Sequence, residues 1–198
     1  MGFDTHALSI PAFRTALEVF AANGVETVIH DKDAYTPTPV ISFLIVAHNR
    51  NAENQLADGV VITPSHNPPR DGGFKYNPPN GGPAHVGETR WIQDRANQLM
   101  GQDRDQVRRM PYQKACAANT IHRKDFMTPF VEALGRVVDM KTIRDAGVRM
   151  GVDPMGGSGV HFWPVIAETY GLNMEVVNPS VDPAFGFMPL DGDGEIRM

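Results

Sequence analysis

The amino-acid sequence predicts an α/β protein, a sheet with helices packed on it. Two observations support this fold class. Short runs rich in β-branched residues alternate along the chain with segments whose apolar residues recur at helical spacing, which is the pattern of a sheet covered by helices. The chain also has 19 glycines and 16 prolines among its 198 residues, and these mark the turns between the segments.

The first helix and strand are predicted within residues 9–30. Ser9 is a favourable N-cap residue, Pro11 suits the first helical turn, and Gly24 is a typical residue at a helix end. The apolar residues on one face of this helix are Phe13, Leu17 and Phe20. Residues 25–30 (Val-Glu-Thr-Val-Ile-His) then read as a strand.

A second helix and a second strand precede Ser65. Pro39 begins the helix, which carries Ile41, Leu44, Ile45 and His48. Residues 58–63 (Asp-Gly-Val-Val-Ile-Thr) read as a buried strand, and Pro64 ends it because proline cannot donate to a β ladder. Ser65 is therefore expected just past a strand end, where ligands bind in open α/β sheets.

The middle of the chain is less regular. A third helix is expected at about residues 87–100, with inward-facing residues Ile92, Ala96 and Leu99. Residues 101–124 are polar and predict a weakly ordered connection. An apolar stripe follows that indicates core packing rather than a ligand site: Phe126, Phe130, Leu134 and Val137 or Val138.

Residues 148–177 predict a strand, a helix and a further strand. Val148, Met150 and Val152 alternate as the first strand, the helix carries Phe162, Val165, Ile166 and Tyr170, and residues 172–177 form the last strand. The turn Gly156–Gly159 between the first strand and the helix can cradle a phosphate or can simply be tight. The absence of a phosphate-loop lysine favours the tight turn.

Ser65 lies in residues 62–69 (Ile-Thr-Pro-Ser-His-Asn-Pro-Pro), and Lys75 follows in residues 72–77 (Gly-Gly-Phe-Lys-Tyr-Asn). The prolines stiffen this loop and lower the entropy cost of holding a reactive group. Serine is a poor nucleophile without a base, a metal or preorganised charge, and His66 and Lys75 are candidates for proton transfer or for neutralising phosphate charge. Taken one at a time, Ser65 could be an ordinary turn residue, His66 an ordinary loop histidine and Lys75 an ordinary solvated lysine. Their order and spacing favour a functional loop.

Residues 63–68 and 73–77 closely resemble the active-site serine loop of the α-D-phosphohexomutases. The continuation to residue 84 resembles the bacterial phosphoglucomutase branch, as do residues 4–9, 35–39 and 152–159. The resemblance implies a mixed sheet sandwiched by helices. Residues 1–140 would be phosphohexomutase domain I, the serine-loop domain, incomplete and lacking its N-terminal strand. Residues 141–198 would be the start of domain II.

The same resemblance implies a phosphoglucomutase, an isomerase of carbohydrate metabolism that interconverts glucose 1-phosphate and glucose 6-phosphate through a phosphoserine and glucose 1,6-bisphosphate. Ser65 would carry the phosphoryl group, and its phosphate would bind Mg²⁺. His66 and Lys75 would bind the substrate phosphate and move protons. His6 stands where many relatives outside this branch carry arginine, which leaves a phosphate contact at that position open.

The family's other metal ligands and its sugar loop, which distinguishes glucose from mannose, have no counterpart in the sequence. We therefore expect little or no mutase activity from this chain alone. The alternative is a non-catalytic remnant that binds sugar phosphate or a partner chain, and missing sheet partners predict self-association through exposed edges. A serine hydrolase is disfavoured because no Gly-x-Ser-x-Gly elbow surrounds Ser65.

The acidic segment near residue 195 is a second candidate for a metal site. Asp191, Asp193 and Glu195 could ligate Mg²⁺ or Ca²⁺ through oxygen. The family metal loop, however, has three aspartates in strict alternation before an arginine. Residues 191–198 instead resemble a segment that precedes that loop in the bacterial branch, so we expect no metal here.

Composition narrows the class of partner. The formal net charge is −5 and no basic block occurs, which argues against nucleic-acid binding. No apolar run reaches the length of a membrane span, and the N-terminus lacks the pattern of a signal peptide. Cys116 is the only cysteine, so no internal disulfide can form, and a reducing cytoplasmic location is expected.

Overall fold

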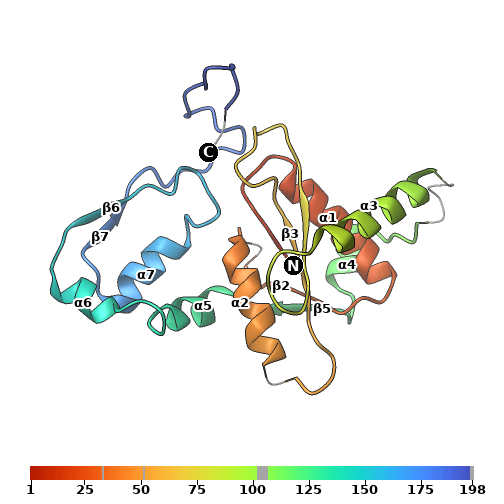
Figure 1. Ribbon diagram of the computed structural model, residues 1–198, viewed down its shortest axis with the longest axis horizontal. Helices are drawn as coiled ribbons and strands as arrows, with labels where there is room; N and C mark the ends of the chain where they lie inside the picture. The colour runs from red at the N-terminus through yellow and green to blue at the C-terminus, as the bar shows by residue number, and fades with distance from the viewer. Residues whose placement is uncertain (33, 51, 102–106, 197–198) are drawn as a thin grey trace.

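The computed structural model describes all residues except 33, 51, 102–106 and 197–198 (Figure 1). Strand and helix alternate up to β3, as the sequence predicts. The elements, in chain order, are β1 (Gly2–Phe3), α1 (Ser9–Ala22), β2 (Thr27–His30), α2 (Thr38–Asn49), β3 (Gly59–Ile62), β4 (Phe74–Asn77), α3 (Val86–Gly101), α4 (Tyr112–Cys116), β5 (Ile121–Lys124), α5 (Met127–Leu134), α6 (Met140–Asp145), β6 (Met150–Val152), α7 (Phe162–Tyr170) and β7 (Met174–Val176).

The strands pair in both senses, which confirms a mixed arrangement. β1 is parallel to β3, and β3 is antiparallel to β4. β2 and β5 form a separate parallel pair, and the Met1 amine donates to the Val28 carbonyl at 2.7 Å, which brings β1 next to β2. β6 and β7 form a third, two-stranded parallel sheet in the later part of the chain.

β3 is covered by helices on both of its faces, because neighbouring strand residues point to opposite sides of a sheet. Val61 belongs to a cluster with α2 residues Val40, Ile41 and Ile45, whereas Ile62 packs in a second cluster with α1 residues Phe13 and Leu17. In Figure 1, α1 and α2 lie on opposite sides of β3. Fully burying an aliphatic side chain of this kind stabilises the fold by about 1.5–3 kcal/mol. The predicted α/β sandwich is thus confirmed.

Residues 101–124 contain two elements that the sequence analysis missed, α4 and β5. β5 pairs with β2 along its whole length, yet its last three residues, His122 to Lys124, are polar and exposed. An exposed strand of this kind has no hydrophobic alternation, so backbone pairing alone identifies it. Residues 102–106 of the expected weakly ordered connection lie outside the described residues.

Helix α3 occurs where it was predicted, but its predicted inward face is wrong. All sixteen residues of α3 are described and none is buried. Ala96 is exposed and Leu99 is 40% exposed, while Ile92 is only partly covered. The helical period correctly identified the element, but this part of the structure offers no partner to cover its apolar face.

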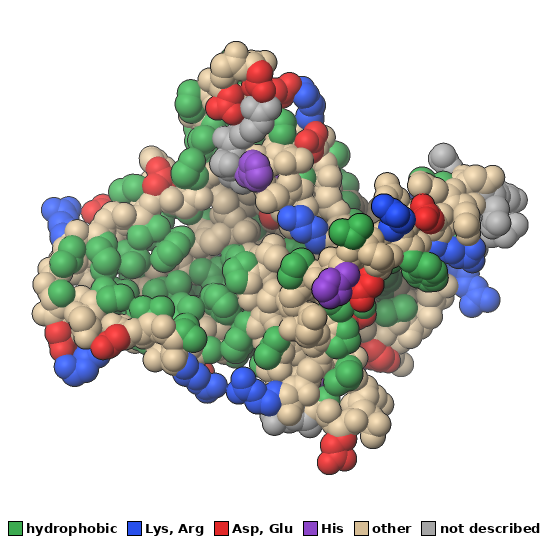
Figure 2. Space-filling model, in the orientation of Figure 1, with side chains coloured by type: hydrophobic (Ala, Val, Ile, Leu, Met, Phe, Trp, Pro, Cys, Tyr) green, Lys and Arg blue, Asp and Glu red, His purple; other side chains and the backbone are tan. Residues whose placement is uncertain are grey.

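The later part of the chain packs against α2 through α5 and α7. Val131 of α5 and the α7 residues Phe162 and Ile166 share the cluster that contains Val40 and Val61. Hydrophobic packing therefore crosses residue 140, and the division into domains there stays a prediction. Figure 2 shows hydrophobic side chains gathered over this later part of the chain. None of the described helices is both long enough and apolar enough to span a bilayer.

Candidate functional site

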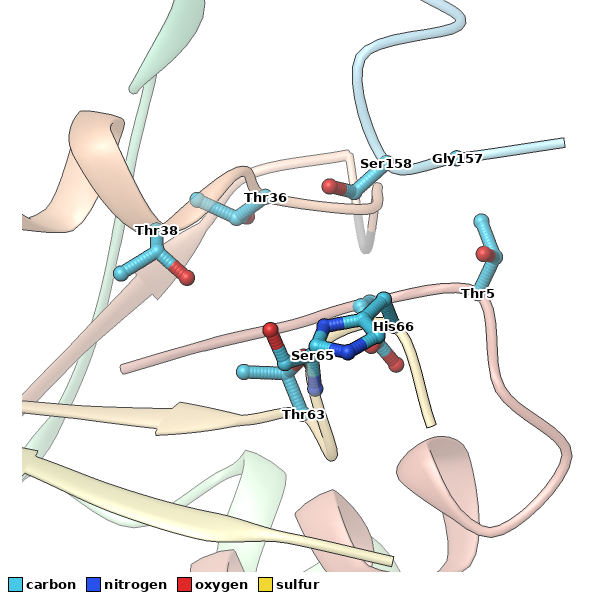
Figure 3. A pocket seen from close by; sticks show the side chains of 9 residues that line it. Thr5, Thr36, Thr38, Thr63, Ser65, His66, Gly157 and Ser158 are labelled. Atoms are coloured by element: carbon cyan, nitrogen blue, oxygen red, sulfur yellow. Dashed lines mark hydrogen bonds between the residues drawn. The ribbon is translucent and has the colours of Figure 1, made fainter. Parts of the chain in front are cut away.

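A cavity of ≈ 260 Å³ opens where β1 and β3 end (Figure 3). Figure 3 shows Ser65 and His66 beside each other, with Thr36, Thr38 and Ser158 across from them. Most lining side chains carry hydroxyls, and they come from segments far apart in the sequence. The lining residues are Asp4, Thr5, Thr36, Thr38, Thr63, Ser65, His66, Gly157 and Ser158.

Ser65 is exposed and has a backbone φ of 69°, in the left-handed region. The Ser65 amide donates to Thr63 Oγ1 at 2.9 Å, and the Thr63 amide donates to the Gly73 carbonyl at 3.0 Å. A non-glycine residue in this conformation costs about 1–2 kcal/mol. The surrounding contacts therefore hold the serine in a strained conformation at the cavity, a common sign of a functional position.

His6 links Asp4 to the backbone of the serine loop through its two ring nitrogens. Its Nδ1 lies 2.8 Å from Asp4 Oδ2, and its Nε2 lies 3.0 Å from the carbonyl oxygen of Asn67. The Ser9 hydroxyl donates to Asp4 Oδ1 at 2.5 Å, so the predicted role of Ser9 as a helix cap is wrong. Both imidazole nitrogens of His6 face oxygen atoms and the side chain is fully buried. His6 thus contacts the loop backbone, and it is not among the residues that line the cavity.

Gly73 closes the hairpin beneath the loop. A Cβ atom at this position would lie 2.0 Å from the carbonyl oxygen of Thr63 and 2.9 Å from the Cα of Pro64. Real side chains do not tolerate such distances to backbone atoms. Only glycine therefore allows β4 to return so close to the residues that lead into Ser65.

The structure brings two of the three predicted site residues to the cavity. Ser65 and His66 both line it. Lys75 lies on β4, opposite Val61 of β3, and is exposed, but it is not among the lining residues. The role of Lys75 in phosphate binding therefore stays a prediction.

The turn after β6 also reaches the cavity, through Gly157 and Ser158. Asp153 shapes this turn by accepting hydrogen bonds from the Asn178 side chain and the Met155 amide, both at 2.8 Å. These two hydrogen bonds hold the pKa of Asp153 below its usual value. The tight-turn interpretation of this segment is thus incomplete, because the turn also forms one wall of the Ser65 cavity.

The segment after residue 180 packs against the serine loop. Phe185 is fully buried with its ring edge-on to His6 at 4.8 Å, and Glu195 pairs with Arg70 at 2.6 Å. Glu195 therefore has a protein partner. Residues 197–198, the last part of the predicted family segment, lie outside the described residues. The expectation that this acidic segment binds no metal stays a prediction.

The lining of the cavity does not by itself fit Mg²⁺, which prefers several oxygen ligands. Asp4 is the one carboxylate among the lining residues, and its two oxygens already accept hydrogen bonds from His6 and Ser9. Among the described residues, one other group brings three side chains with metal-binding atoms together, namely His30, Asp31 and Asp125. None of these three lines the Ser65 cavity.

The chain is similar to proteins of known family. Phosphoglucomutase of Komagataeibacter xylinus is 54% identical over 198 residues, which is 100% of this chain and 36% of that protein. The protein named "Phosphoglucomutase, cytoplasmic" from Mesembryanthemum crystallinum is 36% identical over 92 residues, 45% of this chain and 16% of that protein. The chain thus spans about a third, or less, of the length of these relatives.

Solved structures share the fold. The open form of pp63/parafusin, a phosphoglucomutase from Paramecium, matches 96% of this chain and 37% of its own length, with a TM-score of 0.72 and 19% identity. A phosphoglucomutase/phosphomannomutase family protein from Burkholderia thailandensis matches 93% of this chain and 36% of its own length, with a TM-score of 0.61 and 19% identity. Below 25% identity these likenesses bear on the fold alone.

A sequence model of phosphoglucomutase/phosphomannomutase, alpha/beta/alpha domain I, matches residues 1–102, more than half of the 198 residues. The match includes β1, β3 and the serine loop between β3 and β4, the segments that build most of the Ser65 cavity. The chain therefore belongs to the phosphoglucomutase/phosphomannomutase family.

Proposed function

We propose that this chain carries the phosphoryl-carrier portion of a phosphoglucomutase, with Ser65 as the carrier. The observation that supports this most is the placement of Ser65, exposed and held at a φ of 69° beside a cavity lined by hydroxyls. A family relative that is 54% identical over the whole chain is a phosphoglucomutase, which favours a hexose phosphate as the substrate.

In the proposed reaction a phosphoryl group moves between Ser65 Oγ and a hydroxyl oxygen of the sugar. As the P–O bond to Ser65 breaks, a P–O bond to the sugar forms, and the proton of the sugar hydroxyl ends on Ser65 Oγ. The bisphosphorylated sugar, glucose 1,6-bisphosphate, then returns its other phosphate to the serine by the reverse step. Such transfers depend mainly on positioning and on stabilising charge.

The neighbouring side chains suit a phosphate. A phosphoserine carries about 1.5–2 negative charges near neutral pH. Thr38 and Ser158 can donate hydroxyl hydrogens to phosphate oxygens, and His66 lies beside the serine. We propose that His66 and Lys75 bind the phosphate and move protons.

The Mg²⁺ ion implied by the family would take one ligand from the Ser65 phosphate. Asp4, the one carboxylate among the lining residues, already accepts hydrogen bonds, so the residues described around Ser65 do not complete a Mg²⁺ site. When bound, the ion would offset phosphate charge. We therefore expect phosphorylation of Ser65 without appreciable turnover by the chain alone.

Intact-mass spectrometry tests this proposal. The purified chain is measured before and after incubation with glucose 1,6-bisphosphate, and the modified residue is located by fragmentation. We expect one phosphoryl group on Ser65, none on Ser65→Ala, and little interconversion of glucose phosphates in a coupled assay. The absence of modification, together with no calorimetric binding of glucose 1,6-bisphosphate, would overturn the proposal and support a non-catalytic remnant.

Ser65→Gly is the matched control for folding. Glycine lacks the hydroxyl but adopts a positive φ without strain. This variant should lose the phosphoryl group as completely as Ser65→Ala, while its free energy of unfolding stays equal to that of the wild type or rises by up to about 1 kcal/mol. Phosphate retained on Ser65→Gly would assign the modification to another residue.

We also propose that the chain self-associates through its exposed edges and apolar surfaces. Val86 and Trp91 of α3 are 73% and 69% exposed, and Val137 is 80% exposed. Exposed apolar area of this kind favours association. Sedimentation velocity over a range of protein concentrations should show a sedimentation coefficient that rises with concentration. A single monomer species at every concentration would contradict this prediction.

A further inference from the structure

We propose that His30, Asp31 and Asp125 form a binding site for one divalent transition-metal ion of the Zn²⁺ or Co²⁺ type, separate from the Ser65 cavity. One nitrogen of His30 and one carboxylate oxygen from each aspartate all lie within 4.8 Å of one another. The three side chains come from two strand ends that meet in space, so the group depends on the fold and is not a local run of acids.

Parallel pairing of β2 and β5 creates this arrangement. The register places His30, the last residue of β2, opposite Lys124, the last residue of β5. Asp31 and Asp125 follow directly, so both carboxylates leave the same end of the strand pair. The Asp31 amide donates to the Lys124 carbonyl at 3.0 Å, which continues the ladder by one bond and fixes the two aspartates side by side.

The burial of His30 is the second observation that points to a ligand. His30 is only 4% exposed, and its Nδ1 lies 2.8 Å from Asp31 Oδ1. Nδ1 also accepts the Lys32 amide at 3.3 Å. Nδ1 is therefore the nitrogen that would ligate an ion held between the two aspartates, in exchange for these hydrogen bonds.

The cluster is buried on one side and open on the other. The imidazole forms the buried base, while both aspartates are exposed, with 40% of the Asp31 side chain accessible. Water can therefore complete the coordination of an ion held by the three side chains. Exposed carboxylates can also move to the separations of about 3–4 Å that metal–ligand bonds near 2.1 Å require.

The donor set selects the class of metal. One imidazole nitrogen and two carboxylate oxygens suit Zn²⁺, Co²⁺ or Mn²⁺, whereas Mg²⁺ prefers oxygen ligands throughout. Lys32, Arg123 and Lys124 neighbour the cluster in sequence, and Arg123 donates to the Asp31 carbonyl. These positive charges oppose a cation, so we expect binding on the order of micromolar rather than nanomolar.

The site would tie together two structural segments. Asp125 Oδ1 accepts hydrogen bonds from the amides of Met127 and Thr128 at the start of α5. Asp31 begins the connection that leads to Thr36 and Thr38 at the Ser65 cavity. An ion held by both aspartates would therefore fasten this connection to α5, which predicts a gain in stability on metal binding.

Calorimetry and thermal unfolding of the 198-residue chain with ZnCl₂, CoCl₂ and MgCl₂ test the proposal. We expect one Zn²⁺ ion per chain, a raised Tm, and a Co²⁺ absorption band that reports imidazole and carboxylate coordination. Asp31→Asn should weaken Zn²⁺ binding ~10–100-fold. Asp31 does not cap a helix, so this variant should still fold, and His30→Gln should abolish the Tm gain.

Two matched controls place the site. Asp139→Asn changes an exposed aspartate that accepts the Thr142 amide at the start of α6, and it should leave Zn²⁺ binding unchanged. Asp193→Asn changes the acidic segment near the C-terminus and should also bind Zn²⁺ like the wild type. The proposal is overturned if the wild type does not bind Zn²⁺, if Asp31→Asn binds as well as the wild type, or if Asp193→Asn is the variant that loses binding.

Discussion

Replacing Asp4 with alanine is expected to lower the free energy of unfolding by about 3–5 kcal/mol, because it breaks a buried pair by removing one partner. Asp4 is 7% exposed and accepts hydrogen bonds from the His6 amide, the His6 ring and the Ser9 hydroxyl. Alanine leaves all three donors buried without an acceptor. Urea denaturation followed by circular dichroism measures the loss.

The same change should loosen the serine loop. His6 Nε2 contacts the Asn67 carbonyl, and Asp4 fixes the orientation of that ring. Amide hydrogen exchange in residues 65–71 should therefore accelerate in Asp4→Ala more than in a control variant. Asp139→Ala is a suitable control, since losing that exposed helix cap should cost less stability than losing the buried Asp4 carboxylate. Unchanged exchange in residues 65–71 of Asp4→Ala would show that the pair does not hold the loop.

Replacing Gly73 with alanine should destabilise the fold by about 3 kcal/mol or more, beyond ordinary overpacking. The added Cβ would lie 2.0 Å from the Thr63 carbonyl oxygen. The two residues are joined by the hydrogen bond from the Thr63 amide to the Gly73 carbonyl, directly beside the paired strands β3 and β4. Relief requires the hairpin to open, which displaces the residues that lead into Ser65. Thermal and urea unfolding measure the effect, and the chain should also lose the ability to accept phosphate on Ser65.

Gly72→Ala provides a closely matched control. A Cβ at Gly72 would meet Leu8 at 3.5 Å, an ordinary van der Waals distance. This neighbouring variant should therefore unfold within about 1 kcal/mol of the wild type. Equal stability of the two alanine variants would mean that the hairpin adjusts more easily than the described geometry indicates.

The sequence predicted elements that bury their own residues and missed elements that depend on distant pairing. β3 was recognisable because Val61 and Ile62 are both buried, which gives a continuous apolar run. β5 was not, because its polar, exposed residues acquire a strand conformation only by pairing with β2. α3 shows the converse, since its helical period was visible but no period can reveal whether a partner covers the face.

The candidate site was predictable to a similar degree. Ser65 and His66 are adjacent in sequence and in space, so a short motif was enough to find them. The contact between His6 and Asn67 joins residues 61 positions apart, and the wall formed by Ser158 joins Ser65 from 93 positions away. Asp4 two residues before His6 was a local signal of a paired histidine, but its target in the serine loop required the fold.

The backbone at Ser65 also restricts which residue can serve as phosphoryl acceptor. At a φ of 69°, glycine and asparagine fit the backbone but offer no hydroxyl. Threonine offers a hydroxyl, but its branched Cβ strongly disfavours this conformation. A substitution at this position therefore loses either the hydroxyl or the favourable backbone conformation. The geometry of one dihedral angle thus makes serine the residue that combines the chemistry with the shape of the loop.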